Sequence, residues 1–283
     1  MLIVGLDMGG TTTKAVLISE SKIHGRTVVV ASDPLAAAAG AIGKLLSELG
    51  IPMSEVEAIA SSGGKTKPLP PKILGLEVVE IDEIEAVGVG GLFLSGTNEG
   101  VVVSAGTGTA VVEVRRDDNR TVVRHLGGTG VGAGTLSGLG RLLLRRTSVN
   151  SIIELASRGD PRNVDLTVGD IVGGPIGLLT PDVTASNFGK VGDVVSPEDV
   201  AAGLVNMVGQ VIGTVAFFAA KSVGLHDRII LVGGLVTHEP VLRAILKPIR
   251  LFGGKATVPK DPQFATAIGA ALRLLADKSS LVR

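Results

Sequence analysis

The chain opens with Leu2-Ile-Val-Gly-Leu-Asp-Met-Gly-Gly-Thr-Thr-Thr-Lys-Ala-Val-Leu-Ile18, the stretch that decides its fold. Leu2 to Leu6 is a short apolar run typical of a buried strand, and Lys14 to Ile18 is a second one. The turn between them, Asp7-Met-Gly-Gly-Thr-Thr, is rich in glycine and threonine. The stretch therefore predicts a β-hairpin with a tight turn.

The residues that follow continue the unit. The β-branched run Thr27-Val-Val-Val predicts a third strand, and Leu35 to Leu49, rich in alanine and leucine and stopped by Gly50, predicts a helix. Val56-Glu-Ala-Ile-Ala predicts a fourth strand, which ends at Ser61-Ser-Gly-Gly. The predicted order is strand, strand, strand, helix, strand.

The same order returns about a hundred residues later, and such repetition points to duplication. Val101-Val-Val-Ser-Ala-Gly-Thr-Gly-Thr-Ala-Val-Val-Glu-Val repeats the strand, Gly/Thr turn and returning strand. Thr121 to Leu126 predicts the third strand, Gly134 to Arg146 the helix, and Arg228-Ile-Ile-Leu-Val-Gly-Gly the fourth strand. We therefore expect an α/β protein with halves 1–100 and 101–283, and a ligand cleft between them.

A long helix is predicted from Ser196-Pro-Glu-Asp to about Val223. Serine at the N-cap, proline at the first position and acids in the first turn suit the exposed N–H groups there. The helix is apolar on several faces, so we expect it to be buried, either in the core or in a homodimer interface. The last helix of the chain is expected to pack back on the first half.

Composition excludes several classes of function. The 283 residues carry 27 Lys+Arg against 27 Asp+Glu, so the chain lacks the broad positive charge that binds nucleic acid or anionic membranes. Without cysteine it has no disulfide, thiolate metal site, iron–sulfur cluster or thiol nucleophile. No unbroken apolar run approaches ~18 residues, and no basic flank marks a signal peptide. A cytoplasmic location is expected.

The two Gly/Thr turns are candidate phosphate sites, because glycine lets backbone N–H groups approach a phosphate closely. The first turn adds a carboxylate for magnesium, hydroxyl donors and a cation, whereas the second carries no charge. Either turn alone is more often an ordinary hairpin turn, but their duplication favours a phosphate site. The candidate residues are Asp7, Gly9, Gly10, Thr11, Thr12 and Lys14 in the first turn, and Gly106, Thr107, Gly108 and Thr109 in the second.

Two other nucleotide motifs are weaker. Gly64-Lys65-Thr66 resembles the end of a Walker A loop, but that loop requires glycine at position 59, where Ile59 stands. Gly128-Thr-Gly-Val-Gly-Ala133 fits the loose G-x-G-x-x-A dinucleotide fingerprint. In a chain with 40 glycines this match has little weight.

Asp82, Glu83 and Glu85 bring three carboxylates beside an apolar stretch. Their spacing alone favours the plain explanation that acids start a helix because of its dipole. A phosphoryl transferase also needs a carboxylate to accept the proton of the attacking hydroxyl, so these acids are candidates for that role.

The duplicated turns, together with Val232-Gly-Gly-Leu, resemble the superfamily of acetate and sugar kinases, actin and the large heat-shock ATPases. This resemblance implies duplicated ribonuclease-H-like (actin-like ATPase) domains with an ATP cleft between them. Four further segments resemble type II (eukaryotic-type) pantothenate kinase. They are Asp82-Glu-Ile-Glu, Gly127-Gly-Thr-Gly-Val-Gly-Ala-Gly-Thr-Leu-Ser-Gly-Leu, Ala185-Ser-Asn-Phe-Gly-Lys and Phe264-Ala-Thr-Ala-Ile-Gly-Ala.

The resemblance implies ATP-dependent phosphorylation of pantothenate to 4'-phosphopantothenate, the first step of coenzyme A biosynthesis, by a homodimer that uses Mg²⁺. Carried over by position, Asp7 would hold the magnesium shell, and Gly9 to Thr12 with Gly106 to Thr109 would cradle phosphates. Gly233 and Gly234 would flank the adenosine, and Glu83 matches the family's catalytic base.

The substrate contacts implied by the resemblance lie at His125, Arg124, Gly128, Thr129 and Gly130. The family has an arginine just before its Gly-rich turn that contacts pantothenate, and the aligned position here holds His125, with Arg124 one residue earlier. Because successive side chains of a strand point to opposite faces, only one of the two reaches the cleft. The alignment selects His125.

Other functions share this fold. A kinase of another small hydroxylated substrate, such as a sugar, would use the same ATP site, and a non-catalytic ATPase switch would need no carboxylate at Glu83. An activator of radical dehydratases holds an iron–sulfur cluster through cysteines, which this chain lacks. Coenzyme A or acyl-CoA is a candidate inhibitor, because members of the family differ in that regulation.

Overall fold

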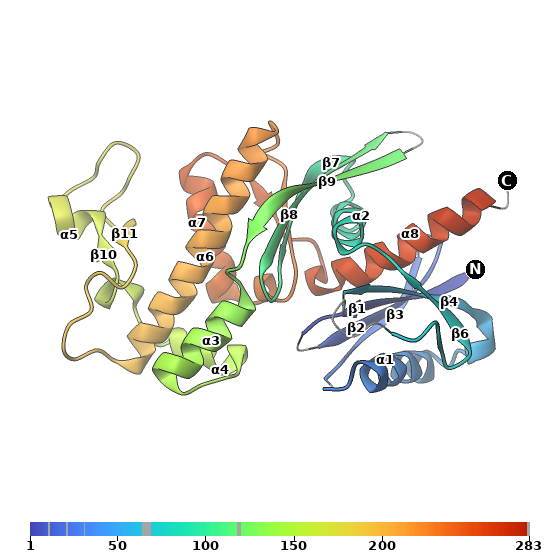
Figure 1. Ribbon diagram of the computed structural model, residues 1–283. Coiled ribbons are helices and arrows are strands. Elements are labelled where there is room, and N and C mark those ends of the chain that lie inside the picture. The colour runs from blue at the N-terminus through green and yellow to red at the C-terminus, as the bar shows by residue number, and fades with distance from the viewer. Residues whose placement is uncertain (11, 21, 31, 64–68, 118–119, 282–283) are drawn as a thin grey trace.

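The computed structural model describes residues 1–283 apart from 11, 21, 31, 64–68, 118–119 and 282–283. Two α/β halves lie side by side, and a small outer subdomain extends from the second (Figure 1). The predicted duplicated, actin-like architecture is confirmed.

The first sheet is built from the N-terminal residues. Its strands are β1 (Leu2–Met8), β2 (Thr13–Ser19), β3 (Lys22–Val29), β4 (Val56–Gly63), β5 (Lys72–Ile73) and β6 (Leu76–Glu80). The spatial order is β3-β2-β1-β4-β6-β5, with β1 and β2 antiparallel and β1 and β4 parallel.

The second sheet repeats this plan. Its strands are β7 (Glu99–Ala105), β8 (Thr109–Asp117), β9 (Arg120–Thr129), β12 (Ile229–Val232) and β13 (Ala256–Thr257). The order β13-β12-β7-β8-β9 matches β6-β4-β1-β2-β3 strand for strand. The third strands are longer than the sequence predicted, because β3 and β9 pair with β2 and β8 along nearly their whole length.

Helices separate and cover the two sheets. They are α1 (Pro34–Leu49), α2 (Glu83–Ser95), α3 (Ala133–Leu144), α4 (Val149–Ala156), α5 (Val168–Val172), α6 (Pro197–Ser222), α7 (Glu239–Leu251) and α8 (Ala265–Leu281), with short 3₁₀ turns at η1 (Met53–Glu55), η2 (Pro161–Asn163), η3 (Leu235–Thr237) and η4 (Pro262–Phe264). Helix α3 ends two residues before the predicted Arg146, because Arg145 adopts a left-handed conformation with φ of 54°.

The last helix returns to the first half. Residues of α8 share a buried cluster with β1, β2 and β4, while α2 packs between α8 and the second sheet. At the crossing, a Cβ atom on Gly90 would overlap the carbonyl oxygen of Ala265, and one on Gly269 would overlap that of Ala86. The two helices therefore meet backbone to backbone between the halves (Figure 1).

The small subdomain consists of α5, β10 (Leu166–Thr167) and β11 (Thr184–Ser186). It is tied to α6 by Asp165, which is 1% exposed and accepts hydrogen bonds from the Phe188 backbone at 2.8 Å and the Asn206 amide at 2.7 Å. The Ala185 to Lys190 segment thus anchors this subdomain on α6.

Helix α6 begins after its N-cap Ser196, as predicted. By length and mean hydropathy it could cross a membrane, although 61% of that apolar window is buried within the protein. From the sequence we expected no segment long and apolar enough to span a membrane, because polar residues such as Asn206 and Gln210 interrupt the apolar run. They lower the mean hydropathy of α6 only slightly, so the helix as a whole meets that criterion. Burial against α4 and α7 accounts for its apolar faces.

Candidate active site

A cavity of about 900 Å³ lies between the two halves. Its walls come from turns at the ends of β1, β4, β7, β9 and β12 and from the starts of helices. It brings together almost all of the predicted residues: Asp7, Gly9, Gly10, Thr12, Lys14, Glu83, Gly106, Thr107, Gly108, Thr109, His125, Gly128, Thr129, Gly130, Gly233 and Gly234. Thr11 and the segment Gly64-Lys65-Thr66 lie outside the described residues.

The two Gly/Thr turns oppose each other across this cavity. A Cβ atom built on Gly10 would lie 3.7 Å from the hydroxyl oxygen of Thr107. Since β1 and β7 occupy equivalent positions in the two sheets, the duplication brings its own two turns face to face. A ligand between them would contact both halves at once.

In the second turn the backbone carbonyl oxygens are hydrogen-bonded, while two backbone N–H groups have no partner among the described residues. The carbonyl oxygens of Gly106 and Thr107 accept from Ala133 and Gly134 at the start of α3, at 2.8 and 2.9 Å. Among the described residues, the N–H groups of Thr107 and Gly108 have no backbone acceptor outside the strands. These two donors are therefore available to a phosphate.

The first turn carries the charge. Asp7 and Lys14 are paired across β1 and β2, and the Lys14 ammonium lies 2.8 Å from the Asp7 carboxylate. The side chain of Asp7 is 15% exposed and that of Lys14 is 16% exposed. No group of three or more His, Asp or Glu side chains that could hold a metal occurs in the described part of the chain.

The three acids at the start of α2 have separate positions. Asp82 is the N-cap and accepts from the backbone of Ile84 at 2.9 Å and of Glu85 at 3.2 Å. Glu85 pairs with Arg273 at 3.2 Å and lines a different cavity. Glu83 lines the cleft. Helix capping thus explains Asp82, whereas Glu83 has the position that a base would need.

Arg124 and His125 point to opposite sides of β9. His125 lines the cleft. Arg124 instead donates to Glu113 on the neighbouring strand, with its Nε 2.7 Å from the carboxylate. Burial opposes ionisation of Glu113, but Arg115 and Arg124 outweigh it and hold its pKa below the ordinary value. The structure does not bring Arg124 to the cleft.

Gly233 and Gly234 lie directly beside the second turn. Gly233 has φ of 100°, and a Cβ atom there would overlap the carbonyl oxygen of Ala105. Its backbone N–H donates to Pro262 at 3.0 Å. Only glycine permits this approach of the β12 end to the β7 end.

Sequence reasoning missed several residues of the cavity wall, among them Val149, Asn150, Leu235, His238, Gln263 and Thr266. Burial lowers the pKa of His238 below that of an ordinary histidine. No local pattern marks these residues, because the packing of α4, α7 and α8 brings them to the cleft. The carboxamide oxygen of Gln263 is buried and lacks a hydrogen-bond partner among the described residues.

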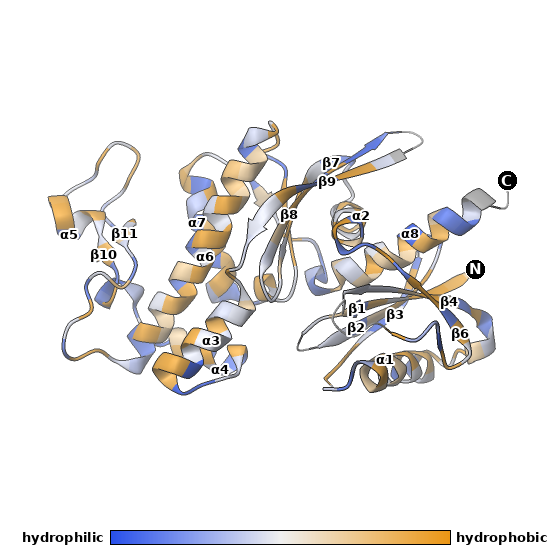
Figure 2. Ribbon diagram, in the orientation of Figure 1, coloured by the Kyte–Doolittle hydropathy of each residue, from blue (hydrophilic) through white to orange (hydrophobic). Residues whose placement is uncertain are grey.

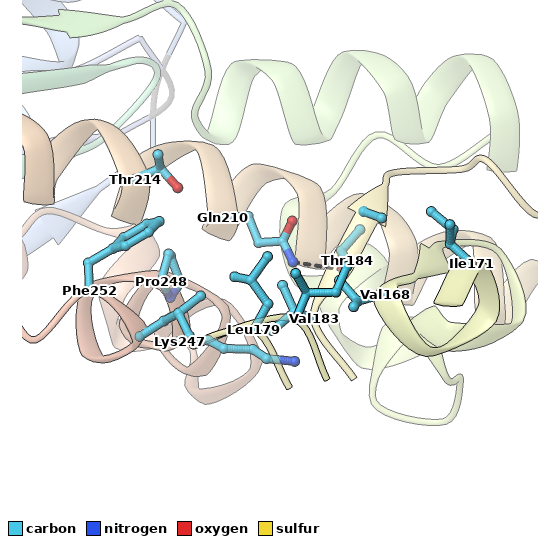
Figure 3. Close-up of a pocket in the computed structure, with 13 residues that line it drawn as sticks. Val168, Ile171, Leu179, Val183, Thr184, Gln210, Thr214, Lys247, Pro248 and Phe252 are labelled. Atoms are coloured by element: carbon cyan, nitrogen blue, oxygen red, sulfur yellow. Dashed lines mark hydrogen bonds between the residues drawn. The ribbon is translucent and has the colours of Figure 1, made fainter. Parts of the chain in front are cut away.

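A second cavity, of about 420 Å³, lies between the small subdomain, α6 and α7 (Figure 3). Its wall is largely apolar, including Ile171, Leu179 and Phe252, with Gln210 and Thr184 hydrogen-bonded at 2.9 Å. None of the predicted site residues belongs to it. The cavity between the halves is therefore the candidate active site.

Two family models match the chain. The Fumble model matches residues 100–273, and the model of the BadF/BadG/BcrA/BcrD ATPase family matches residues 4–160. A type II pantothenate kinase from Bacillus thuringiensis subsp. konkukian is 30% identical over 98% of this chain and 99% of its own. A type II pantothenate kinase from Oceanobacillus iheyensis is 29% identical over 95% of this chain and 98% of its own.

Solved structures share the fold. The activator of 2-hydroxyisocaproyl-CoA dehydratase from Clostridium difficile, with bound ADPNP, has a TM-score of 0.67 and 17% identity over 100% of this chain and 97% of its own. A ROK family glucokinase from Streptomyces griseus, in complex with glucose and AMPPNP, has a TM-score of 0.60 and 18% identity over 96% of this chain and 98% of its own. Both likenesses concern the fold alone. The sequence matches decide the family: the chain belongs to the family that the Fumble model describes and to the type II pantothenate kinase family.

Proposed function

We propose that this protein transfers the γ-phosphoryl group of ATP to the primary hydroxyl of pantothenate. One observation carries the proposal: both Gly/Thr turns, Glu83 and His125 line a single cavity. The cavity joins phosphate-binding turns, a carboxylate that can accept a proton, and a side chain that can contact an anionic acceptor.

Each residue has a distinct task in this reaction. The N–H groups of Thr107 and Gly108, with those of Gly9 and Gly10, hold the phosphates in place. Glu83 accepts the proton of the attacking hydroxyl while the hydroxyl oxygen bonds to the γ-phosphorus; the bond from that phosphorus to the β,γ-bridging oxygen breaks, and ADP leaves. His125 holds the pantothenate carboxylate and thereby orients the hydroxyl toward the phosphorus.

Magnesium is part of the proposal, and Asp7 is the residue that would hold its shell. Mg²⁺ in phosphoryl transferases is bound by one or two carboxylates together with substrate phosphates, so a single carboxylate beside a phosphate turn fits it. When bound, the ion would neutralise charge on the phosphates. Lys14 holds the Asp7 carboxylate within the cleft.

The proposal is tested by transfer of labelled γ-phosphate from ATP to pantothenate, with the product identified by mass. We expect one phosphopantothenate for each ATP consumed, and little ATP turnover without acceptor. ATP turnover that is the same with or without pantothenate would instead indicate an ATPase switch.

We further propose a homodimer. Its support is the apolar surface around the second cavity, where Ile171, Ile176 and Phe218 are 58%, 51% and 50% exposed. Phe218 contacts Phe252 of the cavity wall, with ring centroids 5.1 Å apart, and the ribbon of α5 has largely the colour of hydrophobic residues (Figure 2). Light scattering after gel filtration tests this state. Ile171→Glu should shift a dimer toward monomer.

We also propose that coenzyme A or acyl-CoA inhibits the enzyme and that the protein is cytoplasmic. Coenzyme A contains the pantothenate unit, so we expect it to compete with pantothenate for the acceptor end of the cleft. Initial rates at varied pantothenate and coenzyme A test the competition, and cell fractionation tests the location.

A further inference from the structure

Ser62, near the end of β4, has a buried hydroxyl group without a partner. The residue is 0% exposed, and its Oγ atom forms no hydrogen bond with any described residue. Such a hydroxyl destabilises the fold, because folding removes its hydrogen bonds to water and replaces them with none. In native proteins an orphaned buried polar group calls for an explanation, and a role in catalysis or beside a bound ion is a common one.

The register of the strands places Ser62 beside Asp7. Asp7 of β1 pairs with Ser62 of β4 on one side and with Lys14 of β2 on the other. Neighbouring strands of a sheet lie only ~4.7–4.9 Å apart. The three residues therefore form one row across the first sheet, with Asp7 in the middle.

The three side chains of this row project from the same face of the sheet. Side chains alternate between the two faces along a strand. Ile3, Val16 and Ala60 lie an even number of positions from the members of the row, and all three belong to the buried cluster that includes α8. The residues that flank Asp7 in the sequence pack instead in the cluster of α1. The row therefore lies on the α8 face.

Asp7 and Ser62 differ in their access to the cleft. Asp7 lines the cavity between the halves, whereas Ser62 is not among the described residues of its wall. Helix α8 covers this face of the sheet (Figure 1). Two residues before Asp7, a Cβ atom on Gly5 would overlap the carbonyl oxygen of Ala267 in that helix. The Ser62 hydroxyl is thus shielded from water, next to a carboxylate that faces the cleft.

The Asp7 carboxylate has room for a second donor. The Lys14 ammonium donates to its Oδ2 atom at 2.8 Å, and no described residue donates to Oδ1. A serine hydroxyl can donate one hydrogen bond, and its hydrogen rotates to meet an acceptor. A bond from a hydroxyl to an ionised carboxylate is shorter and stronger than one between neutral groups. The unsatisfied hydroxyl and the unsatisfied oxygen are therefore complementary.

We propose that Ser62 is a positioning residue, whose hydroxyl donates to the Asp7 carboxylate and holds it toward the magnesium shell; this rests on the proposed kinase function. Lys14 bonds one carboxylate oxygen and Ser62 the other, so rotation of the carboxylate is restricted from both sides. Groups that orient a metal-holding side chain matter for the metal, and their loss typically lowers its affinity ~10–100-fold.

Calorimetric titration of the full chain with ADP, once in magnesium and once in EDTA, tests the proposal. Ser62→Ala should reduce the gain in ADP affinity that magnesium gives by about tenfold, and should leave the affinity in EDTA unchanged. Ser61→Ala is the matched control. Ser61 lies on the same strand but pairs with Leu6 of the α1 cluster, so it projects from the opposite face and should change neither affinity.

Two further measurements separate positioning from a purely structural role. When Asp7→Ala has already removed the carboxylate, adding Ser62→Ala should cause no further loss of the magnesium effect, because Ser62 acts through Asp7. In urea and without ligand, Ser62→Ala should unfold at the same midpoint concentration as the parent protein or at a higher one. The variant removes a buried hydroxyl that has no partner, whereas loss of a residue needed for the fold would lower the midpoint.

An unchanged magnesium effect in Ser62→Ala would overturn the proposal, as would the absence of any magnesium effect in the parent protein. An equal tenfold loss with and without the Asp7 carboxylate would also overturn it. A lower urea midpoint together with weaker ADP binding in EDTA would assign Ser62 to the fold alone. These measurements contain no phosphoryl acceptor, so failure to phosphorylate pantothenate would overturn the proposed function and leave this test intact.

Discussion

The ammonium nitrogen of Lys14 lies 2.8 Å from the carboxylate of Asp7, at the last pairs of the β1–β2 ladder before the first Gly/Thr turn. The pair places one negative and one positive charge at the mouth of a phosphate-binding turn. Lys14 thereby fixes the direction of the Asp7 carboxylate toward the cleft.

Asp7→Asn should raise the magnesium concentration needed for half-maximal activity about 10–100-fold, the range typical when a group that orients a metal shell is lost. A magnesium titration of the initial rate measures it. Asp33→Asn is the control, because Asp33 caps α1 outside the cleft and asparagine caps helices equally well. An unchanged magnesium requirement in Asp7→Asn would remove Asp7 from the metal site.

Glu83→Gln should lower kcat ~10²–10⁴-fold while ATP still binds, because the amide keeps the shape of the side chain but accepts no proton. Glu85→Gln is the matched control, since Glu85 pairs with Arg273 outside the cleft. Steady-state rates of the two variants show which of the two glutamates accepts the proton. Loss of turnover in Glu85→Gln with near-normal Glu83→Gln would exchange their roles.

His125→Ala should raise the KM for pantothenate more than the KM for ATP, because His125 lines the cleft and is proposed to hold the pantothenate carboxylate. Arg124→Ala should change neither KM much, since Arg124 bonds Glu113 on the other side of β9. Steady-state kinetics of the two variants measure the difference, and a raised KM for pantothenate in Arg124→Ala alone would show that Arg124 makes the contact.

His238 should make the stability of the fold depend on pH. Burial lowers its pKa below that of an ordinary histidine, so the folded protein takes up this proton at a lower pH than the unfolded chain does. In the unfolded chain a histidine gains its proton near pH ~6.5, and the unfolded state therefore binds more protons as the pH falls below that value. Thermal unfolding should accordingly show that His238→Phe loses less stability than the parent protein between pH 6.5 and 5.

The crossing of α2 and α8 should not accept a side chain at Gly90. A Cβ atom there would overlap the Ala265 carbonyl, so Gly90→Ala should lower the free energy of unfolding by about 1–3 kcal/mol. Gly43→Ala in α1 is the control, because nothing lies within 4 Å of its Cβ position and alanine favours helices by up to about 1 kcal/mol. Urea unfolding of both variants measures the difference.

Local sequence patterns were enough to predict the duplicated core. Strands such as β1 and β7 contain short apolar runs, Leu2–Leu6 and Val101–Val103, and helices such as α1 and α6 carry their own capping residues. The hairpin of β5 and β6 and the pairing of β10 with β11 were not predicted. These strands of two to five residues show no alternation and no unbroken apolar run, and β10 begins directly after Asp165, whose bonds to Asn206 and Phe188 join residues far apart in the sequence.

In the candidate active site, too, some residues could be predicted from local patterns and others could not. Asp7 and Gly106 stand in or directly beside Gly/Thr turns whose composition marks them, whereas the roles of Gly233, Glu83 and His125 came from the family resemblance. Asn150 and His238 carried no signal, because each is an ordinary helix-start residue until α4 and α7 meet at the cleft. The choice between Arg124 and His125 depended on the alternation of side chains along β9, and Arg124 lies on the side of Glu113.

The proposed kinase activity is decided by comparing the phosphorylation of pantothenate with that of glucose by the purified protein, with ATP and magnesium present. Pantetheine is included as a third acceptor, since it differs from pantothenate only at the end remote from the attacked hydroxyl. We expect pantothenate to be phosphorylated with a far higher kcat/KM than glucose, and Glu83→Gln to abolish most of that turnover. Robust phosphorylation of glucose with no turnover of pantothenate would contradict this expectation.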